Sequence, residues 1–398
     1  MVRLTTVLVA AMFCTTLLAM PSAVAAVDSV THWVATHGTV HGTGTSCSDP
    51  GYVGSNQEPI TAALTAAAAG DVVVICAGRY LYEDDGFSTA LQDNVTIIGE
   101  GIGKTVLDGD DNYYLLSIEG GSNLSIQGVS FVHGSDTYGG GLYILDSVIE
   151  VDSCEFSDNT TSESGADYGG AGVYIQDDSE VTITRSRFRN NIAPSDSAGA
   201  AINIYTSGGA EAYVSVSRSS FIGNQAGQGP AIYLYDANGW AGDPSTLNVD
   251  SNSFINNVNT NPDDGNADGG AIAFEHTNAH LVMTNNVFRE NSGAYSGGAV
   301  EIWDVDGSIT VERNTFTRNS GGEGGAMWID VRNGTKTIRR NRFIGNTADV
   351  GGAIAFECET SSGSRVVRDL KRHNIFISNR SAVRRTSDIV ASDYGCVW

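Results

Sequence analysis

A short motif recurs along this chain and restricts the kind of fold that the chain can adopt. The stretch at residues 269–275, Gly-Gly-Ala-Ile-Ala-Phe-Glu, returns letter for letter at residues 351–357, and every copy is followed by Phe-x-x-Asn. The phenylalanines paired with the motif lie 27 to 34 residues apart, at Phe156, Phe188, Phe221, Phe254, Phe288, Phe316, Phe343 and Phe376. Self-similarity at such a period is typical of a solenoid, in which each repeat packs against its neighbours.

Within a repeat, apolar residues alternate with period two after the glycines. Counting the first glycine of each copy as position zero, positions +3 and +5 are apolar almost throughout, which predicts a strand with these residues inside. In the first two copies, counted from Gly140 and Gly169, this rule places Tyr143 and Tyr174 in the core. A second strand precedes each phenylalanine and a short third is expected, so each repeat should form one coil.

Letters repeated at fixed positions predict side-chain ladders along the stack. The phenylalanines should stack in the core. Each asparagine of Phe-x-x-Asn should sit in a turn, where it tolerates a left-handed backbone and bonds to main chain. A second ladder of small polar residues is predicted at the position two residues before each phenylalanine, and Cys154 occupies one of its positions. A structural thiol is therefore expected at Cys154 rather than a nucleophile.

Residues 1–25 have the pattern of a secretory signal peptide. Arg3 supplies the positive start, an uncharged apolar run follows, and the small residues Ala23-Val24-Ala25 end it. No other run approaches the ~20 apolar residues that a membrane-spanning helix needs. The sequence therefore predicts a secreted or cell-surface protein without a transmembrane segment once the signal is removed.

Residues 26–55 hold three histidines, His32, His37 and His41, among Gly, Thr and Ser. Three histidines suggest a metal site, but the glycines between them oppose the helix that would bring them together. A flexible N-terminal segment is the preferred interpretation.

The next stretch predicts a cap on the solenoid. Residues 59–70 should form a short helix, with Pro59 in its first turn and Gly70 at its end, and residues 71–76 a buried strand. The order helix, Gly-Asp-Val-Val-Val, Gly-x-Tyr and Val-Thr-Ile-x-Gly-x-Gly resembles the N-terminal coils of pectin-lyase-like proteins. This resemblance implies an all-β fold, a right-handed parallel β-helix that is a single-stranded solenoid with a short N-terminal capping helix. Its predicted parts are a β-helix at 56–379, with the cap at 56–80 and the repeats at 140–379, and a C-terminal cap at 380–398.

The paired Gly-Gly-Ala-Ile and Phe-x-x-Asn motifs resemble the repeats of chlamydial polymorphic outer membrane proteins over residues 140–379. This resemblance implies a surface-exposed passenger with an adhesive role and an association with the cell outer membrane.

Charge narrows the choice of partners. The chain has 22 Lys and Arg against 46 Asp and Glu, a net charge of −24. This balance argues against nucleic acid and anionic lipid, which both need clustered cations, and favours a soluble monomer. No cofactor is expected apart from Ca²⁺, for which the weak candidate ligands are Asp263, Asp264 and Asp268 in an acidic loop.

Of the six cysteines, Cys14 lies in the predicted signal. Cys47 and Cys76 flank the first ordered region, while Cys358 and Cys396 flank the last. Each pair is predicted to form a disulfide at one end of the solenoid, although sequence spacing alone leaves the pairing open.

Positions +4 and +6 of the Gly-Gly-Ala-Ile strand should face outward. The candidate ligand-binding residues at these positions are Tyr205, Tyr233, Tyr235, Trp303 and Trp328, together with Glu275 and Glu301. Aromatic rings stack on sugar faces and carboxylates accept hydrogen bonds from hydroxyls, so these residues predict a glycan-binding strip. The alternative is that aromatic residues occur here because they favour strands.

An enzyme is the competing interpretation. Pectin-lyase-like folds host polysaccharide lyases and glycoside hydrolases, and glycosidases use two carboxylates ~5–9.5 Å apart. The weak catalytic candidates are Glu275, Glu301 and Asp330, on successive coils. Adhesion or recognition of a polysaccharide or cell-surface glycan is preferred, a carbohydrate-active enzyme is the alternative, and a structural spacer without ligand is the third reading.

Overall fold

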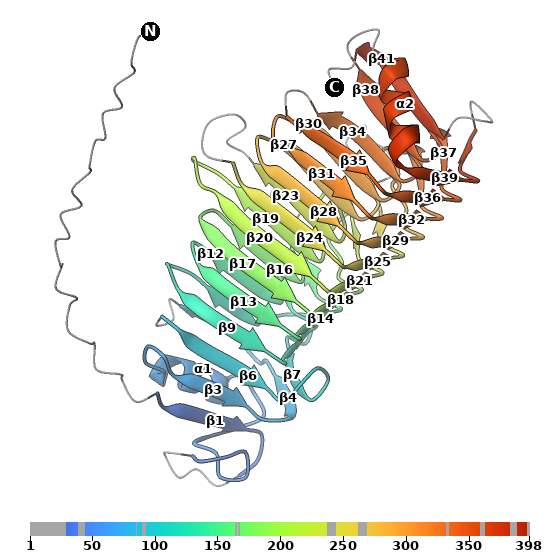
Figure 1. Cartoon of the computed structure of the whole chain (residues 1–398). Helices are drawn as coiled ribbons and strands as arrows, with labels where there is room; N and C mark the ends of the chain where they lie inside the picture. The colour runs from blue at the N-terminus through green and yellow to red at the C-terminus, as the bar shows by residue number, and fades with distance from the viewer. Residues whose placement is uncertain are drawn as a thin grey trace, which may run out of the picture.

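The chain winds into a right-handed parallel β-helix whose coils contribute strands to three long sheets (Figure 1). The computed structural model describes residues 29–38, 44–84, 86–89, 93–163, 165, 168–236, 244–261, 269–331, 334–358, 363–382 and 388–395. Every pairing between the strands of these sheets is parallel, as a single-stranded solenoid requires. The predicted signal peptide and His41 lie outside the described residues.

Sheet 1 is formed mainly by the strands that precede each phenylalanine. In spatial order it contains β2 (Tyr52–Val53), β1 (Thr31–Ala35), β3 (Val72–Ile75), β6 (Val95–Gly99), β9 (Asn123–Gln127), β13 (Val148–Asp152), β17 (Ser179–Thr184), β20 (Ala212–Ser217), β24 (Thr246–Asp250), β28 (His280–Thr284), β31 (Ile309–Glu312) and β35 (Lys336–Arg339). Sheet 2 carries the phenylalanines on short strands, which are β4 (Gly78–Leu81), β7 (Thr105–Asp108), β10 (Ser130–Val132), β14 (Glu155–Ser157), β18 (Arg187–Arg189), β21 (Ser220–Ile222), β25 (Ser253–Ile255), β29 (Val287–Arg289), β32 (Thr315–Thr317), β36 (Arg342–Ile344) and β39 (Ile375–Ile377).

Sheet 3 contains the strands of the Gly-Gly-Ala-Ile motif. Its members are β5 (Phe87–Thr89), β8 (Leu116–Ile118), β12 (Leu142–Leu145), β16 (Val173–Gln176), β19 (Ile202–Thr206), β23 (Ile232–Asp236), β27 (Ile272–Thr277), β30 (Val300–Val305), β34 (Met327–Val331), β38 (Ile354–Cys358) and β41 (Ile389–Gly395). Short strands pair along the corner between sheets 2 and 3, namely β11 (Ser135–Asp136) with β15 (Thr160–Thr161), β22 (Gln225–Ala226) with β26 (Val258–Asn259), and β33 (Ser320–Glu323), β37 (Thr347–Val350) and β40 (Arg380–Ser381) with one another. The three strands predicted for each repeat are therefore present.

The predicted phenylalanine ladder forms the centre of the core. From Phe131 to Phe376, successive rings lie with centroids 4.6 to 5.0 Å apart and planes within 10° of parallel. This spacing follows from the strand spacing, because parallel strands of neighbouring coils lie about 4.8 Å apart.

The asparagines of Phe-x-x-Asn form a buried hydrogen-bonded ladder. In each rung the Nδ2 group donates to the Oδ1 atom of the next asparagine, as in Asn224 to Asn257 at 2.9 Å, and also to a main-chain carbonyl, that of Phe188. The left-handed backbone was predicted for the wrong residue. The residue before the ladder asparagine adopts it, for example Asn256 with φ 54°, because this residue makes the turn while the ladder side chain points inward.

Cys154 lies where the ladder prediction placed it. Its side chain is fully buried, in line with Ser186 in the next coil, whose hydroxyl accepts a hydrogen bond from the Cys154 amide. Burial raises the pKa of the Cys154 thiol to about 12, so the reactive thiolate is absent at neutral pH.

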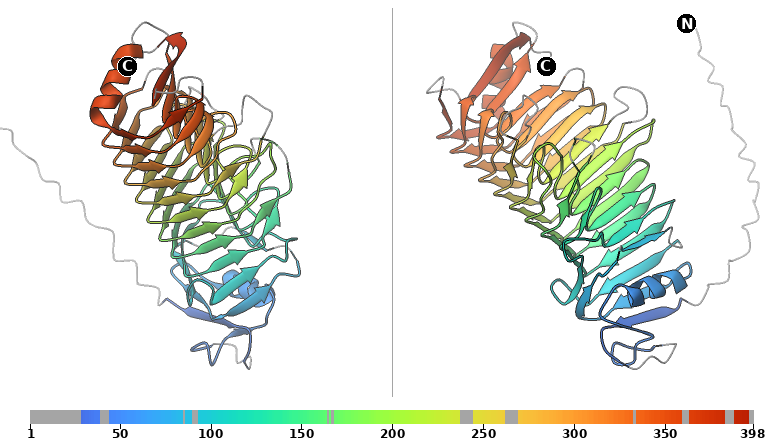
Figure 2. Two further views of the ribbon diagram at one scale, coloured as in Figure 1. Left: turned by 90° about the vertical axis from the view of Figure 1, so that its right-hand side faces the viewer. Right: turned by 180° about the vertical axis from the view of Figure 1, so that it is seen from behind.

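The N-terminal end is closed by helix α1 (Glu58–Ala66), which buries Ile60 and Leu64 against the first coils (Figure 2). The predicted disulfide between Cys47 and Cys76 is present. The segment predicted to be flexible instead contains β1 and β2, which extend sheet 1 beyond β3. The alternation His-Trp-Val-Ala in this segment is short, and only pairing with β3 makes it a strand.

Asp71 joins this cap to the first coil. Its carboxylate accepts hydrogen bonds from the Val30 and Ala68 amides at 2.8 Å and lies 3.0 Å from His32 Nε2. Burial alone would raise the pKa of Asp71, but the two amides and His32 hold it below its usual value. His32 therefore has a structural partner, and no metal is needed to explain its position.

We expect acid to loosen the cap through Asp71. A lowered pKa stabilises the fold fully above the ordinary aspartate pKa of about 3.9, and this contribution is lost as the pH falls through the lower folded value. Asp71→Asn should cost about 1–3 kcal/mol of unfolding free energy at pH 7, and the difference from wild type should shrink below pH 4. Urea unfolding at several pH values measures this, with the exposed Asp93→Asn as control; a pH-independent difference would contradict it.

The C-terminal end is covered by helix α2 (Gly363–His373), which lies at the opposite end of the stack from α1 (Figure 2). Val366 and Leu370 are buried against the last coils. The second predicted disulfide cannot be placed, because Cys396 and the Cys358 side chain lie outside the described residues. Among the residues that the structure describes, no helix is long and apolar enough to span a bilayer.

Candidate functional site

The outward face of sheet 3 carries two parallel rows of side chains. Strand register aligns the inner row as Tyr143, Tyr174, Asn203, Tyr233, Ala273, Glu301 and Trp328. The outer row runs beside it as Gln176, Tyr205, Tyr235, Glu275 and Trp303. The aromatic and acidic residues predicted to form one strip therefore lie on neighbouring strands of one face.

The predicted register was wrong in the first two copies. Leu142 pairs with Val173 and Val173 with Ile202, so the core positions follow Gly139 and Gly170 rather than Gly140 and Gly169. A slip of one residue moves every side chain to the other face of a strand. Tyr143 and Tyr174 consequently belong to the outward row of sheet 3, where Tyr143 is half-buried and Tyr174 is covered. The three consecutive glycines at residues 139–141 are compatible with a count from either Gly139 or Gly140, so the sequence did not distinguish the two registers.

Much of the predicted strip is covered rather than open. Tyr233 is 1 % exposed, Glu275 and Glu301 are 2 % and Trp328 is 8 %. The corner segment between sheets 2 and 3 folds against the inner row, so that Ala198 packs on Tyr233. Trp328 Nε1 donates to Glu323 Oε2 of β33 at 3.2 Å.

The half-exposed rings of the strip are therefore the outer-row residues Tyr205, Tyr235 and Trp303. The Tyr205 and Tyr235 rings stack with centroids 6.0 Å apart. Tyr233 OH donates to Glu275 Oε2 at 3.3 Å, so this carboxylate is tied to the row beside it.

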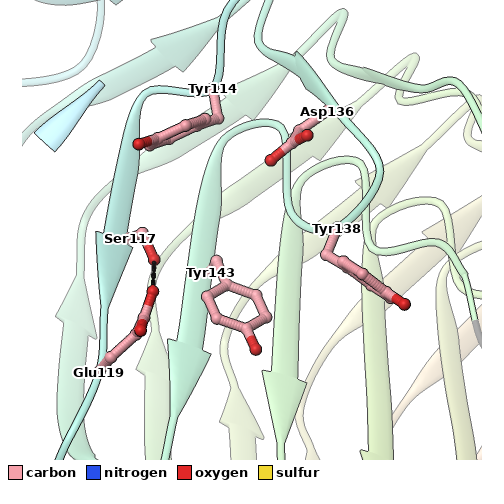
Figure 3. Close-up of a pocket in the computed structure, with 6 residues that line it drawn as sticks. All are labelled: Tyr114, Ser117, Glu119, Asp136, Tyr138 and Tyr143. Carbon is pink, nitrogen blue, oxygen red and sulfur yellow. Dashed lines mark hydrogen bonds between the residues drawn. The ribbon is translucent and has the colours of Figure 1, made fainter. Parts of the chain in front are cut away.

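A groove lies at the N-terminal end of the inner row, beside Tyr143. Tyr114, Ser117, Glu119, Asp136, Tyr138 and Tyr143 line a cavity of about 160 Å³. Figure 3 shows Tyr143 between Glu119 on one side and Tyr138 on the other. Ser117 Oγ donates to Glu119 Oε1 at 2.8 Å, which orients that carboxylate. The groove thus combines three phenol rings with two carboxylates.

A cluster of tyrosines forms one wall of this groove. Tyr138, on the corner loop, contacts Tyr143 with ring centroids 6.3 Å apart, Tyr174 at 5.0 Å and Tyr168 at 5.3 Å. Tyr143 and Tyr174 stack at 5.8 Å. Aromatic contacts of this kind hold the rings in place without filling the cavity.

Tyr143 is held as a hydrogen-bond donor. Its hydroxyl donates to Gln176 Oε1 at 2.8 Å. Burial, followed by the negative charges of Glu119 and Asp177, raises the pKa of Tyr143 to about 12. The phenol therefore stays protonated at physiological pH. The repeat pattern did not indicate this groove, because its residues come from the first coils, where the repeat motif is degenerate.

The three catalytic candidates occupy neighbouring strands of sheet 3. Glu275 on β27 lies in the outer row and Glu301 on β30 in the inner row, so they are diagonal neighbours across one strand step. Asp330 on β34 is half-buried. The three carboxylates therefore lie on successive coils, but Glu275 and Glu301 are almost wholly covered.

The candidate Ca²⁺ ligands Asp263, Asp264 and Asp268 lie outside the described residues. Within the part of the chain that the structure describes, the only group of metal-binding residue types within ligand distance is Cys47, Cys76 and Glu100, and its two cysteines form the disulfide.

Comparison with known proteins agrees with this architecture. The family model described as right handed beta helix region matches residues 93–304. A PL6 family polysaccharide lyase from Pseudopedobacter saltans is similar in structure, with 13 % identity, a TM-score of 0.44 and coverage of 85 % of this chain and 92 % of the lyase chain. This level of similarity carries no information on activity. A search of curated proteins finds no match. Since the matched residues make up more than half of the 398, the chain belongs to the right handed beta helix region family.

Proposed function

We propose that this protein is a secreted or cell-surface β-helix protein that binds a polysaccharide along sheet 3, with the groove at Tyr114, Tyr138 and Tyr143 as its principal sugar site. The observation that carries the proposal is the convergence of three tyrosines and two carboxylates on one cavity. Phenol rings offer flat apolar faces to a sugar ring, and Glu119 and Asp136 offer acceptors to its hydroxyls.

The outer row continues from this groove along the solenoid axis. Tyr205 and Tyr235 lie on adjacent coils and Trp303 lies two coils beyond Tyr235, at about 4.8 Å per coil, so one extended glycan chain would contact several of them. The signal-like residues 1–25 support export. The similarity of the repeats to those of polymorphic outer membrane proteins supports an adhesive role at a cell surface.

Removal of the groove tyrosines should abolish most binding. We expect Tyr138→Ala with Tyr143→Ala to weaken polysaccharide binding by about tenfold or more, since tenfold corresponds to 1.4 kcal/mol and two ring contacts are lost. A glycan array followed by affinity electrophoresis measures this. The matched control is Tyr213→Ala, an exposed tyrosine on sheet 1. Equal affinity in the double variant and the wild type would rule out the groove as the site.

Trp303→Ala tests the strip separately. A weaker contribution, about threefold, is expected for a long glycan and none for a short one that fills only the groove. If Trp303→Ala lost binding while the groove double variant bound as tightly as wild type, the site would lie on the strip alone.

The buried acidic pair favours a second candidate, a carbohydrate-active enzyme. Glu275 and Glu301 are both buried and lie on adjacent strands, and glycoside hydrolases act through a pair of carboxyl groups. Reducing-sugar and unsaturated-product assays on acidic polysaccharides separate the candidates. Turnover by the wild type that is lost in Glu275→Gln and Glu301→Gln supports the enzyme. Binding without turnover supports recognition. Absence of both binding and turnover supports a spacer.

A further inference from the structure

Positive charge is concentrated at the C-terminal end of this acidic chain. Residues 336–385 hold 11 of the 22 Lys and Arg residues but only 4 of the 46 Asp and Glu residues. In the structure this segment forms the last coils and helix α2, which lies across the end of the solenoid (Figure 1). The net charge of −24 therefore conceals a strong separation of charge along the axis.

Five exposed cations form one C-terminal basic surface, defined by Arg340, Arg342, Lys371, Arg372 and Arg380. Main-chain contacts join its parts. The Arg340 amide donates to the carbonyl of His373, which ends α2, at 2.6 Å, and Arg342 pairs with Ile375 in sheet 2.

The cations of this surface are not used inside the protein. Among the described residues, Arg342, Lys371 and Arg372 form no ion pair, whereas two arginines of nearby coils do: Arg318 pairs with Glu290, and Arg339 with Glu312. Asp369 is exposed nearby but pairs with His373 at 3.2 Å. Cations in the last turn also suit the helix dipole of α2, but that effect does not account for Arg342 or Arg380 on the sheets.

Apolar side chains are exposed beside these cations. Ile375 and Ile377 on β39 point outward from sheet 2 and are 47 % and 43 % exposed. Ile377 pairs with the half-buried Ile344 on β36, so the isoleucines form a small continuous patch. A free anion or an acidic sugar would use the cations of this surface but would leave the isoleucines in water.

We infer that the C-terminal basic surface docks the last coils of this solenoid, through the outward face of β39 and the exposed side of α2, against an anionic lipid bilayer. The arginines and Lys371 contact headgroup phosphates, while Ile375 and Ile377 enter the interface between headgroups and acyl chains. Acidic side chains that lie farther from the bilayer than the Debye length of about 8 Å at physiological ionic strength repel it only weakly, because that repulsion is screened.

The bilayer contact lies far from the sugar groove. Eight strand steps in sheet 3 separate β12, which carries Tyr143, from β41 at the C-terminal end. At about 4.8 Å per step, the groove stands roughly 38 Å along the axis from the last coil. An anchor at the last coils would thus leave the groove clear of the contact.

Vesicle flotation of the full chain tests this inference. We expect binding to vesicles of phosphatidylcholine with phosphatidylglycerol, and at least tenfold weaker binding to pure phosphatidylcholine. The triple variant Arg342→Glu, Lys371→Glu, Arg372→Glu should bind anionic vesicles at least tenfold more weakly. Ile375→Ser with Ile377→Ser should weaken binding and make it more sensitive to salt. Residues 1–25 are present in every variant, so their own contribution cancels.

The matched control is Arg187→Glu, Arg189→Glu, Arg218→Glu, which changes the net charge equally using exposed arginines of coils farther from the C-terminal end. Its binding should stay within threefold of wild type. An equal loss in both triple variants would show a net-charge effect and overturn the inference. So would equal binding of wild type to both vesicle types, or retention on an immobilised acidic polysaccharide without vesicle binding. Unchanged circular dichroism of each variant excludes misfolding as the cause.

Discussion

Asn257→Ala should lower the unfolding free energy by about 3–5 kcal/mol, one of the two largest effects that we expect from a single substitution in this chain. The Asn257 side chain lies in the middle of the buried ladder. Its Nδ2 donates to the Phe221 carbonyl at 3.1 Å and to Asn291 Oδ1 at 2.9 Å. Its Oδ1 accepts from the Asn224 amide at 3.2 Å and from Asn224 Nδ2 at 2.9 Å.

Alanine would leave several of these partners buried without a hydrogen bond. Each buried polar group left unsatisfied costs about 1–3 kcal/mol. The void that alanine leaves is too small to hold enough water molecules to satisfy all of these groups. The cost should therefore exceed that of losing a single ordinary hydrogen bond, which is about 1 kcal/mol.

Urea unfolding followed by far-ultraviolet circular dichroism measures this effect. The neighbouring Asn256→Gly is the matched control, because Asn256 is exposed and has the left-handed φ of 54° that glycine accepts. We expect that control within about 0.5 kcal/mol of wild type. Similar midpoints for the two variants would show that the ladder does not hold the coils together.

The second large effect is expected at the phenylalanine stack. Phe254→Ala should cost about 3–5 kcal/mol, because a fully buried ring is lost between neighbours whose centroids lie 4.8 Å and 4.6 Å away. Solenoid stability depends on contacts between adjacent coils, so this substitution weakens the junction between the two halves of the stack.

Limited proteolysis combined with urea unfolding measures this second effect. We expect Phe254→Ala to produce cleavage near the middle of the chain. Phe376→Ala removes the same side chain at the end of the stack, where the ring is half-buried and stacks on Phe343 alone among the described phenylalanines. It should cost less and loosen only the C-terminal coil. An equal cost at both positions would contradict the nearest-neighbour account.

The candidate site shows where sequence reasoning ends. The period-two pattern correctly assigned Tyr205, Tyr235 and Trp303 to the outward face of sheet 3, because alternation along a strand is a local property. It did not reveal that Glu275 and Glu301 are covered, since burial depends on packing between segments and not on alternation along one strand. The groove at Tyr138 and Tyr143 was not predicted, because the repeat is degenerate in the first coils and the glycines there suggested a register that put Tyr143 in the core.

Basic residues give a second example. Net charge argued against anionic lipid as a partner, because composition averages over the whole chain. The structure groups Arg342, Lys371 and Arg372 beside Ile375 at one end, and a partner is recognised by local charge rather than by the average.

The sequence by itself determined the solenoid and its coil-by-coil ladders, because these follow from a repeat that stacks on copies of itself. The Cys47–Cys76 pairing, which the spacing of the cysteines left open, came from the structure. The tertiary structure decided the register at Gly139, the strands at β1 and β2, the burial of the strip and the groove at its end. Each of these depends on contacts between segments that differ from coil to coil. A repeat pattern predicts what identical coils share, whereas a binding site is formed where they differ.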